Sequence, residues 1–172
     1  AASKADPRFY WLVVAFFASG LMSIGYEILW MRSVIHLLGG ATYVFSSVLT
    51  VYLLGNVIGA GIGSRLIGRL KLPPVGFATI LAVLGLCGVL YPSLLIYWTS
   101  ELLPPVNQML NSLYPMVPTI HHILNPLIQC AFMFLVPSTI MGIGFPIAVQ
   151  AFTDHMHGIG RPTGVAYGAN TI

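Results

Sequence analysis

Between Val75 and Trp98 the sequence reads VGFATILAVLGLCGVLYPSLLIYW, a stretch of mostly apolar side chains that contains no charged residue. A helix of about 20 such residues is long enough to cross the hydrocarbon core of a bilayer. Three further windows have this length and apolar character, and they run from Phe9 to Ile35, from Tyr43 to Leu66 and from Ile123 to Phe152. None of the four alternates apolar and polar residues as the strands of a membrane barrel do. The sequence therefore predicts a single all-α domain, a bundle of four transmembrane helices.

The composition of the whole chain agrees with this prediction. Of 172 residues, 57% are hydrophobic and 6% are charged, whereas soluble domains carry roughly 25% charged residues. Seven basic and four acidic side chains are too few to cover a water-soluble particle, which excludes a soluble enzyme, a disordered linker and a nucleic-acid reader with a basic face. Cys87 and Cys130 both fall within apolar stretches, which excludes a disulfide-stapled secreted domain.

The basic residues predict how the chain is oriented, because Lys and Arg in short loops stay on the cytoplasmic side. If the N-terminus lies in the cytoplasm, six of the seven basic residues fall in cytoplasmic segments and only Arg32 falls on the opposite side. The six are Lys4, Arg8, Arg65, Arg69, Lys71 and Arg161. In this orientation Trp30 and Trp98 are expected at the outer interface, where aromatic residues are enriched.

Two segments lie outside the four windows. An apolar face at helical spacing predicts a short interfacial helix over about residues 104 to 114, after the third span. From Arg161 onward small and apolar residues begin to resemble another membrane helix, so we expect a fifth span that is incomplete at the C-terminus.

The second span carries glycine at every fourth position, and these glycines share one side of the helix. In lipid, helices associate through close contact between small residues, since the hydrophobic drive between them is absent. The residues predicted to pack against another helix are Gly55, Asn56, Gly59, Ala60 and Gly63.

Ionisable residues in or near the spans are the other candidates for function. Glu27 and Arg32 lie toward the end of the first span, and we expect either structural anchors or a site for a proton or cation. The histidines nearest the outer boundary, His36, His121 and His122, are weak candidates for a metal because their spacing matches no known ligand pattern. No metal and no cofactor is predicted.

Three prolines interrupt the fourth span, and they are Pro126, Pro137 and Pro146. Proline removes a helical hydrogen bond and kinks the rod, and discontinuous helices often frame transport sites. The chain shows no glycine-rich nucleotide turn and no nucleophile with its base, so we predict that it is not an enzyme.

Three stretches together resemble the membrane domain that precedes spermidine synthase-like (polyamine aminopropyltransferase) domains in fused bacterial membrane proteins. They are Ser19 to Arg32 with its Tyr-Glu-x-x-Trp-x-Arg motif, Gly55 to Arg69, and Pro137 to Pro146 with Met-Gly-x-x-Phe-Pro, followed by Gly160-Arg161 and Gly164 to Thr171. The resemblance implies a bacterial inner-membrane location and a transferase domain that commonly follows, which these residues do not contain.

These observations favour a non-catalytic membrane anchor or accessory subunit that contacts lipid and packs into a larger membrane protein complex. The alternative is a fragment of a transporter for a small solute or polyamine, using Glu27, Asn56 and a broken fourth span. A weaker alternative is a subunit of a membrane redox complex whose outer histidines contact a cofactor.

Overall fold

The computed structural model describes residues 7–39, 42–68, 72–113, 118–155, 164 and 168. Within these ranges the chain is helical and contains no strand. The helices are α1 (Pro7–Leu38), α2 (Thr42–Ile67), α3 (Pro73–Tyr97), α4 (Leu103–Leu113) and α5 (Pro118–His155), with the π-helical segment η1 (Trp98–Leu102) between α3 and α4. The expected fifth span lies outside the described residues, apart from Gly164 and Gly168.

Four helical stretches are long and apolar enough to cross a membrane, and these are Val13–Leu37, Thr42–Ile67, Pro73–Leu113 and Ile123–Thr153. This confirms the prediction of an all-α bundle with four membrane-spanning helices. By the length and composition of its helices, the protein is a multi-pass membrane protein.

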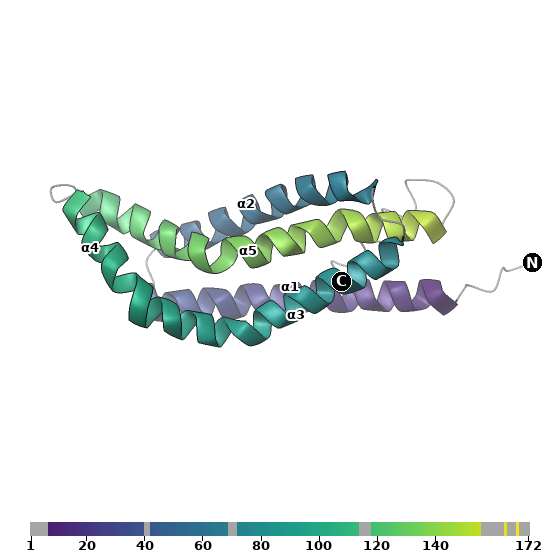
Figure 1. Ribbon diagram of the computed structural model, residues 1–172, viewed down its shortest axis with the longest axis horizontal. Helices are drawn as coiled ribbons and strands as arrows, with labels where there is room; N and C mark the ends of the chain where they lie inside the picture. The colour runs from purple at the N-terminus through teal and green to yellow at the C-terminus, as the bar shows by residue number, and fades with distance from the viewer. Residues whose placement is uncertain are drawn as a thin grey trace, which may run out of the picture.

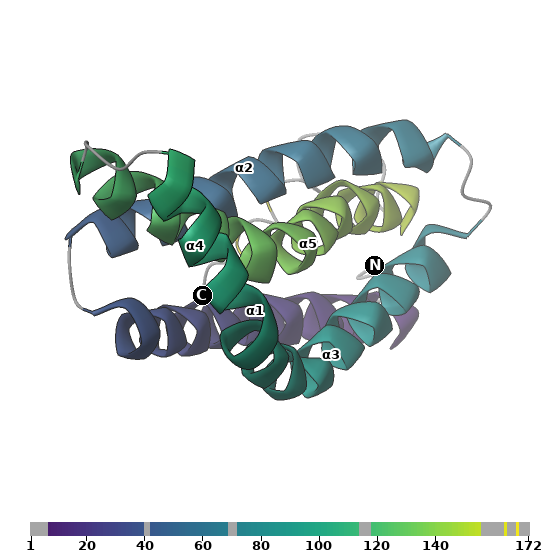
Figure 2. The same cartoon turned by 60° about the vertical axis from the view of Figure 1, so that its left-hand side comes forward.

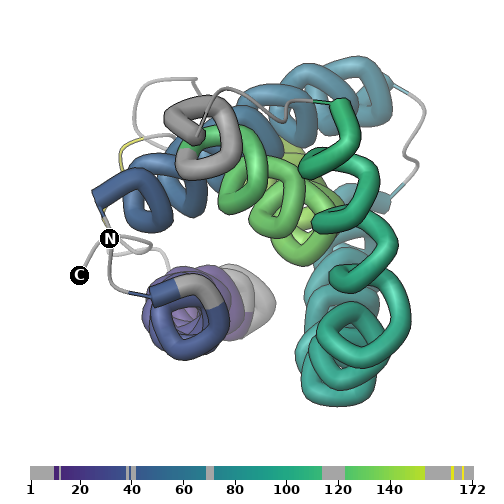
Figure 3. The backbone as a smooth tube through the Cα atoms, turned by 90° about the vertical axis from the view of Figure 1, so that its left-hand side faces the viewer, coloured from purple at the N-terminus to yellow at the C-terminus, as the bar shows by residue number. Residues whose placement is uncertain are grey.

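The four long helices are arranged as two pairs. α2 and α5 run side by side along one side of the molecule, and α1 and α3 lie along the other (Figures 1 and 2). The most extensive helix contact in the described chain is between α2 and α5, whereas the backbones of α1 and α3 come close at few positions and the two helices meet through side chains such as Phe16 and Phe77. Seen along the bundle, α1 stands apart from its neighbours (Figure 3). One pair of helices is therefore tightly joined and the other is not.

Apolar side chains form two clusters at different depths of the bundle. The first lies near the start of α1 and the end of α5, and its buried members are Phe16, Phe77, Ile147, Ala148, Ala151 and Phe152. The second lies in the opposite half, and its buried members are Trp30, Val34, Val44, Val48, Val51, Cys130 and Phe134. Aromatic rings pack closely in both, as the 5.3 Å between the ring centroids of Trp30 and Phe134 illustrates. Trp30, which the sequence predicted at the outer end of the first span, is packed inside the bundle and is 4% exposed.

A glycine closes α1 and sets the turn into α2. The Gly39 N–H donates to the Ile35 carbonyl at 3.0 Å, and Gly39 has a positive φ of 84°. Such a left-handed residue at the end of a helix is strained for side chains other than glycine.

The helix expected outside the third span is present, but it is a continuation of that span and not a separate element. At η1 the Leu103 N–H donates to the Trp98 carbonyl, five residues back, which is the hydrogen bond of a π-helix. Pro104 and Pro105 follow and lack N–H groups, so an ordinary α-helical register cannot pass through them undisturbed. α4 then bends toward the start of α5 (Figure 1), where Leu110 is buried.

Trp98, predicted at the outer end of the third span, packs inside the bundle at this bend. It is 3% exposed, and its ring stacks on Phe132 of α5 with 4.0 Å between the ring centroids. The stack fixes the bent end of α3 against α5.

α5 is one continuous helix in spite of its three internal prolines. The broken fourth span that the transporter alternative used is therefore not present. Neighbouring helices can hold a proline-containing membrane helix together where a hydrogen bond is missing. For α5 the neighbour with the most extensive contact is α2.

Candidate functional site

The contact between α2 and α5 is made by small residues that let the two backbones touch. Gly55, Gly59 and Gly63 are all buried in it. A Cβ placed on Gly59 would lie 2.9 Å from the Gly142 Cα of α5, a distance that real Cβ atoms essentially never show. At Gly63 an added Cβ would lie 2.6 Å from the Pro146 ring. Glycine is required here because any side chain would force the helices apart.

The contact is reciprocal. A Cβ on Gly142 would lie 2.8 Å from the Asn56 Cα and against the Asn56 carbonyl oxygen, while one on Gly59 would meet the Thr139 carbonyl oxygen. Such close approaches of backbone to carbonyl are typical of Cα–H···O contacts between helices, which add weakly to van der Waals packing. We call the α2–α5 contact around Gly55, Gly59, Gly63 and Gly142 the glycine seam.

The glycine seam is filled by the chain itself. All of the atoms that crowd its three α2 glycines belong to α5. Ala60, which the sequence placed among the packing residues, is exposed and lies outside this contact. The α5 half of the seam was missed, although Ser138, Gly142 and Pro146 repeat every four residues as the α2 glycines do.

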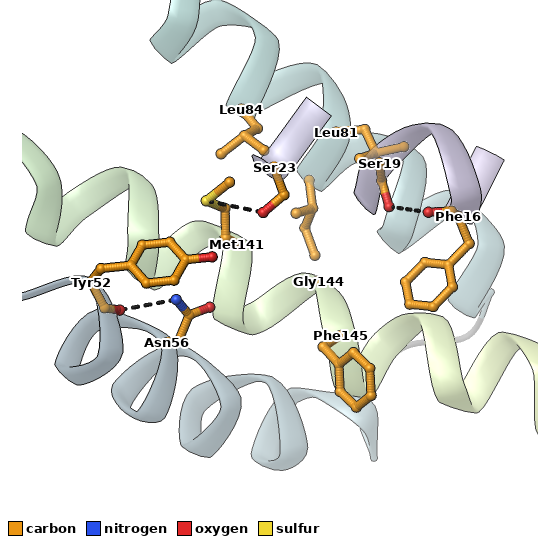
Figure 4. A pocket seen from close by; sticks show the side chains of 11 residues that line it. Phe16, Ser19, Ser23, Tyr52, Asn56, Leu81, Leu84, Met141, Gly144 and Phe145 are labelled. Carbon is orange, nitrogen blue, oxygen red and sulfur yellow. Dashed lines mark hydrogen bonds between the residues drawn. The ribbon is translucent and has the colours of Figure 1, made fainter. Parts of the chain in front are cut away.

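A cavity of about 200 Å³ lies beside the glycine seam, between the two apolar clusters. It is formed by α1, α2, α3 and α5, and Figure 4 shows the side chains that point into it. Its lining residues are Phe16, Ser19, Ser23, Tyr52, Asn56, Ile80, Leu81, Leu84, Met141, Gly144 and Phe145. The cavity is near the middle of each span, where bilayer water is scarce.

Polar atoms from α1 and α2 face this cavity with unused hydrogen-bonding capacity. Ser19 Oγ donates to the Phe16 carbonyl at 2.7 Å, which leaves its oxygen as an acceptor. Ser23 Oγ has only the Met141 sulfur as a partner, at 3.9 Å, and a thioether is a weak acceptor. Asn56 Nδ2 donates to the Tyr52 carbonyl at 2.9 Å, so its carbonyl oxygen is the group left to accept (Figure 4).

The Tyr52 hydroxyl adds a further donor. It points toward Met141 and Ser23 (Figure 4), and it makes no hydrogen bond to a described residue. Sequence reasoning missed it because Tyr52 lies in an apolar run where a tyrosine resembles any other core aromatic residue. Donors and acceptors thus converge on the cavity, while none of the described residues that line it carries a carboxylate, amine, guanidinium or imidazole.

The two ionisable candidates do not join this site. Glu27 is half-buried on the same side of α1 as Ser23 and Trp30, yet it does not line the cavity. Arg32 is exposed. Among the described residues, neither side chain makes a hydrogen bond or an ion pair. Glu27 and Arg32 are therefore not brought together into a binding site.

The histidine candidates are also separated from the cavity. His36 is exposed in the last turn of α1. His121 and His122 lie in the first turns of α5, and their side chains are outside the described part of the chain. In the described ranges no three His, Cys, Asp or Glu residues come together as metal ligands would.

The chain matches no protein-family model, no curated protein and no solved structure. The resemblance to the spermidine synthase-like membrane domain thus stays a prediction made from its motifs.

Proposed function

We propose that the protein is a non-catalytic integral membrane module, an anchor or accessory subunit that packs into a larger membrane protein complex. We also propose that it is related to the membrane domains of spermidine synthase-like bacterial proteins. The proposal is supported chiefly by one observation, the unequal burial of the four spans.

Within the chain, 39% of the apolar window of α5 is buried, but only 6% of the window that contains α3. Large apolar side chains such as Val89, which is 76% exposed, cover the outer side of α3. Lipid alone can cover this surface, and so can another membrane helix. The continuous α3–η1–α4 stretch would give such a partner a long contact surface.

The transporter alternative gains less support. Its cation form requires an acidic group at the binding site, and no ionisable group of that kind lines the cavity. It also relied on a broken fourth span, whereas α5 is continuous. The redox alternative relied on the outer histidines, and His36 has no metal-ligand neighbours in the described chain.

Site-specific photocrosslinking in the native membrane tests the proposal. A photoreactive amino acid at Val89 of α3 is compared with one at Val57 of α2, which is similarly exposed at 70%. We expect the probe at Val89 to form a discrete crosslink to another polypeptide. This partner should co-purify with the chain at a fixed stoichiometry. When the partner is tagged and purified instead, this chain should co-purify with it.

The proposal fails if both positions give only lipid adducts and the chain is monomeric in mild detergent. It also fails if the isolated chain converts a metabolite on its own.

A further inference from the structure

A second hollow adjoins the polar cavity on the side of α1 and α3. It has a volume of about 300 Å³ and a mainly apolar lining that includes Ala15, Ala18, Met22 and Gly85. Ala18, Met22 and Gly85 are exposed, so this hollow opens sideways to the surroundings of the bundle, where lipid lies in a membrane. We call it the α1–α3 groove.

The groove and the cavity share part of their walls. Ser19, Leu81 and Leu84 line both hollows. A Cβ placed on Gly88 would meet the Tyr26 ring, and the rings of Phe16 and Phe77 also pack between α1 and α3. The boundary between groove and cavity therefore consists of side chains on two helices that meet through their side chains, and not of packed backbone.

Polar groups that line the cavity have hydrogen-bonding capacity beyond the contacts they make within the chain. Burying an amide or hydroxyl group in an apolar environment without a hydrogen bond is costly, and bilayer hydrocarbon supplies none. The groups with remaining capacity are the Tyr52 hydroxyl, the second N–H and the carbonyl oxygen of Asn56, and the oxygens of Ser19 and Ser23 as acceptors; Ser23 donates only to the weak Met141 sulfur acceptor. A ligand with a hydroxyl or carbonyl group satisfies this set. A charged head group does not, because it would be buried without a counter-charge.

We propose that the cavity and the α1–α3 groove form one binding site for a neutral single-chain amphiphile. Its hydroxyl or carbonyl end binds at Ser23, Tyr52 and Asn56, and its apolar chain lies in the groove and extends toward the bilayer. The amphiphile enters from the membrane between α1 and α3. This site does not depend on whether the protein is an accessory subunit.

The experiment uses the full chain reconstituted in nanodiscs and a long-chain fatty alcohol that carries a diazirine in its chain. A matched probe has the same chain with a phosphate head group. After irradiation, mass spectrometry locates and quantifies the adducts, and unlabelled fatty alcohol is added as competitor. We expect saturable labelling of α1 and α3 residues of the groove by the alcohol, and at least tenfold weaker labelling by the phosphate probe.

Two variants test the two ends of the site. Gly85→Leu fills the groove, and nothing lies within 4 Å of a Cβ at Gly85, so the fold tolerates the change. We expect it to abolish saturable labelling. Tyr52→Phe removes one hydroxyl and should weaken binding roughly three- to tenfold, the size of one hydrogen bond.

Gly61→Leu is the matched control for Gly85→Leu, because a Cβ at Gly61 also has no neighbour within 4 Å and Gly61, in α2, does not line the groove. The fatty-alcohol probe should label this variant to the same extent as the unmodified chain. Labelling that does not saturate and is equal in all variants would show that only bulk lipid is present and would overturn the proposal. Equal labelling by the alcohol and the phosphate probes, or no adduct at the groove because water alone fills the cavity, would overturn it as well.

Discussion

The α2–α5 pair and the α1–α3 pair differ in how their two helices contact each other. At the glycine seam the backbones of α2 and α5 touch, and Gly59 has no room for a methyl group. Between α1 and α3 the contacts are made by side chains. Tyr26 lies over Gly88, with a hollow of about 300 Å³ on either side of it, and the ring of Phe16 packs on that of Phe77. Backbone contact cannot yield without separating the helices, whereas a side chain can rotate.

The difference shows where this bundle is rigid and where it can open. Since lipid is as apolar as the helix surfaces, the tight pair is stabilised by packing contacts that any added atom disrupts. The loose pair has few such contacts to lose. The cavity lies between the two pairs, so one of its walls is fixed and the other is movable.

The largest expected effect is at the centre of the glycine seam. Gly59→Leu should destabilise the fold by about 3 kcal/mol or more, because overpacking a close contact without room for relaxation is costly. Gly61→Leu, two residues away with open space around it, should change the stability little. Denaturation of both variants in mixed micelles checks this, and equal stability of the two would show that the seam is not a close contact.

A single added methyl group tests the α5 side of the same contact. Gly142→Ala should lower the free energy of unfolding by about 1–3 kcal/mol relative to Gly144→Ala. At Gly142 the added Cβ meets the Asn56 backbone, whereas at Gly144 its nearest neighbour is Ile80 Cγ2 at an ordinary 3.4 Å. Both variants replace a glycine within a helix by alanine, so the gain in helix propensity is the same in each. The difference between their free energies of unfolding therefore reports packing alone. Equal stability of the two variants would mean that the backbones of α2 and α5 are farther apart than described.

The loose pair should respond more weakly to the same change. Gly88→Ala pushes the Tyr26 ring, which can rotate at a cost of about 0.5–1.5 kcal/mol. Gly85→Ala meets nothing within 4 Å and serves as the control on the same helix. We expect Gly88→Ala to be less stable than Gly85→Ala by about 1 kcal/mol in thermal or denaturant unfolding. A loss as large as at Gly142 would mean that α1 and α3 are as tightly joined as α2 and α5.

The smallest effect is expected at Glu27. Because Glu27 has no partner in the described chain, Glu27→Gln should change stability by less than about 0.5 kcal/mol. Size-exclusion profiles should likewise stay the same. If solute uptake into vesicles by the unmodified chain is measurable and Glu27→Gln reduces it, the transporter alternative regains support.

The sequence was sufficient to predict the four long helices and the α2 side of the glycine seam. The four apolar windows and the spacing of Gly55, Gly59 and Gly63 follow from local periodicity, which a single helix displays by itself. It did not predict that Trp30 and Trp98 are buried, because an aromatic residue near the end of a span can be exposed or packed inside. Only the tertiary contacts with Phe134 and Phe132 show that both side chains are packed inside the bundle.

The other differences have a similar origin. Pro104 and Pro105 favour the first turn of a new helix as much as they tolerate a π-helical bend, and the bend depends on Trp98 reaching α5. The cavity was not predictable because its polar residues come from α1 and α2, and an isolated Tyr52 or Ser23 in an apolar run carries no sign of its neighbours.

The most direct test of the account is a pair of distance distributions from pulsed electron spin resonance in nanodiscs. In a background with Cys87→Ala and Cys130→Ala, one pair of spin labels joins α2 to α5 at Val57 and Val136, and the other joins α1 to α3 at Leu21 and Leu86. All four label positions are exposed. We predict a single narrow distribution for the α2–α5 pair and a broader one for the α1–α3 pair. An α2–α5 distribution as broad as that of α1–α3 would contradict the account.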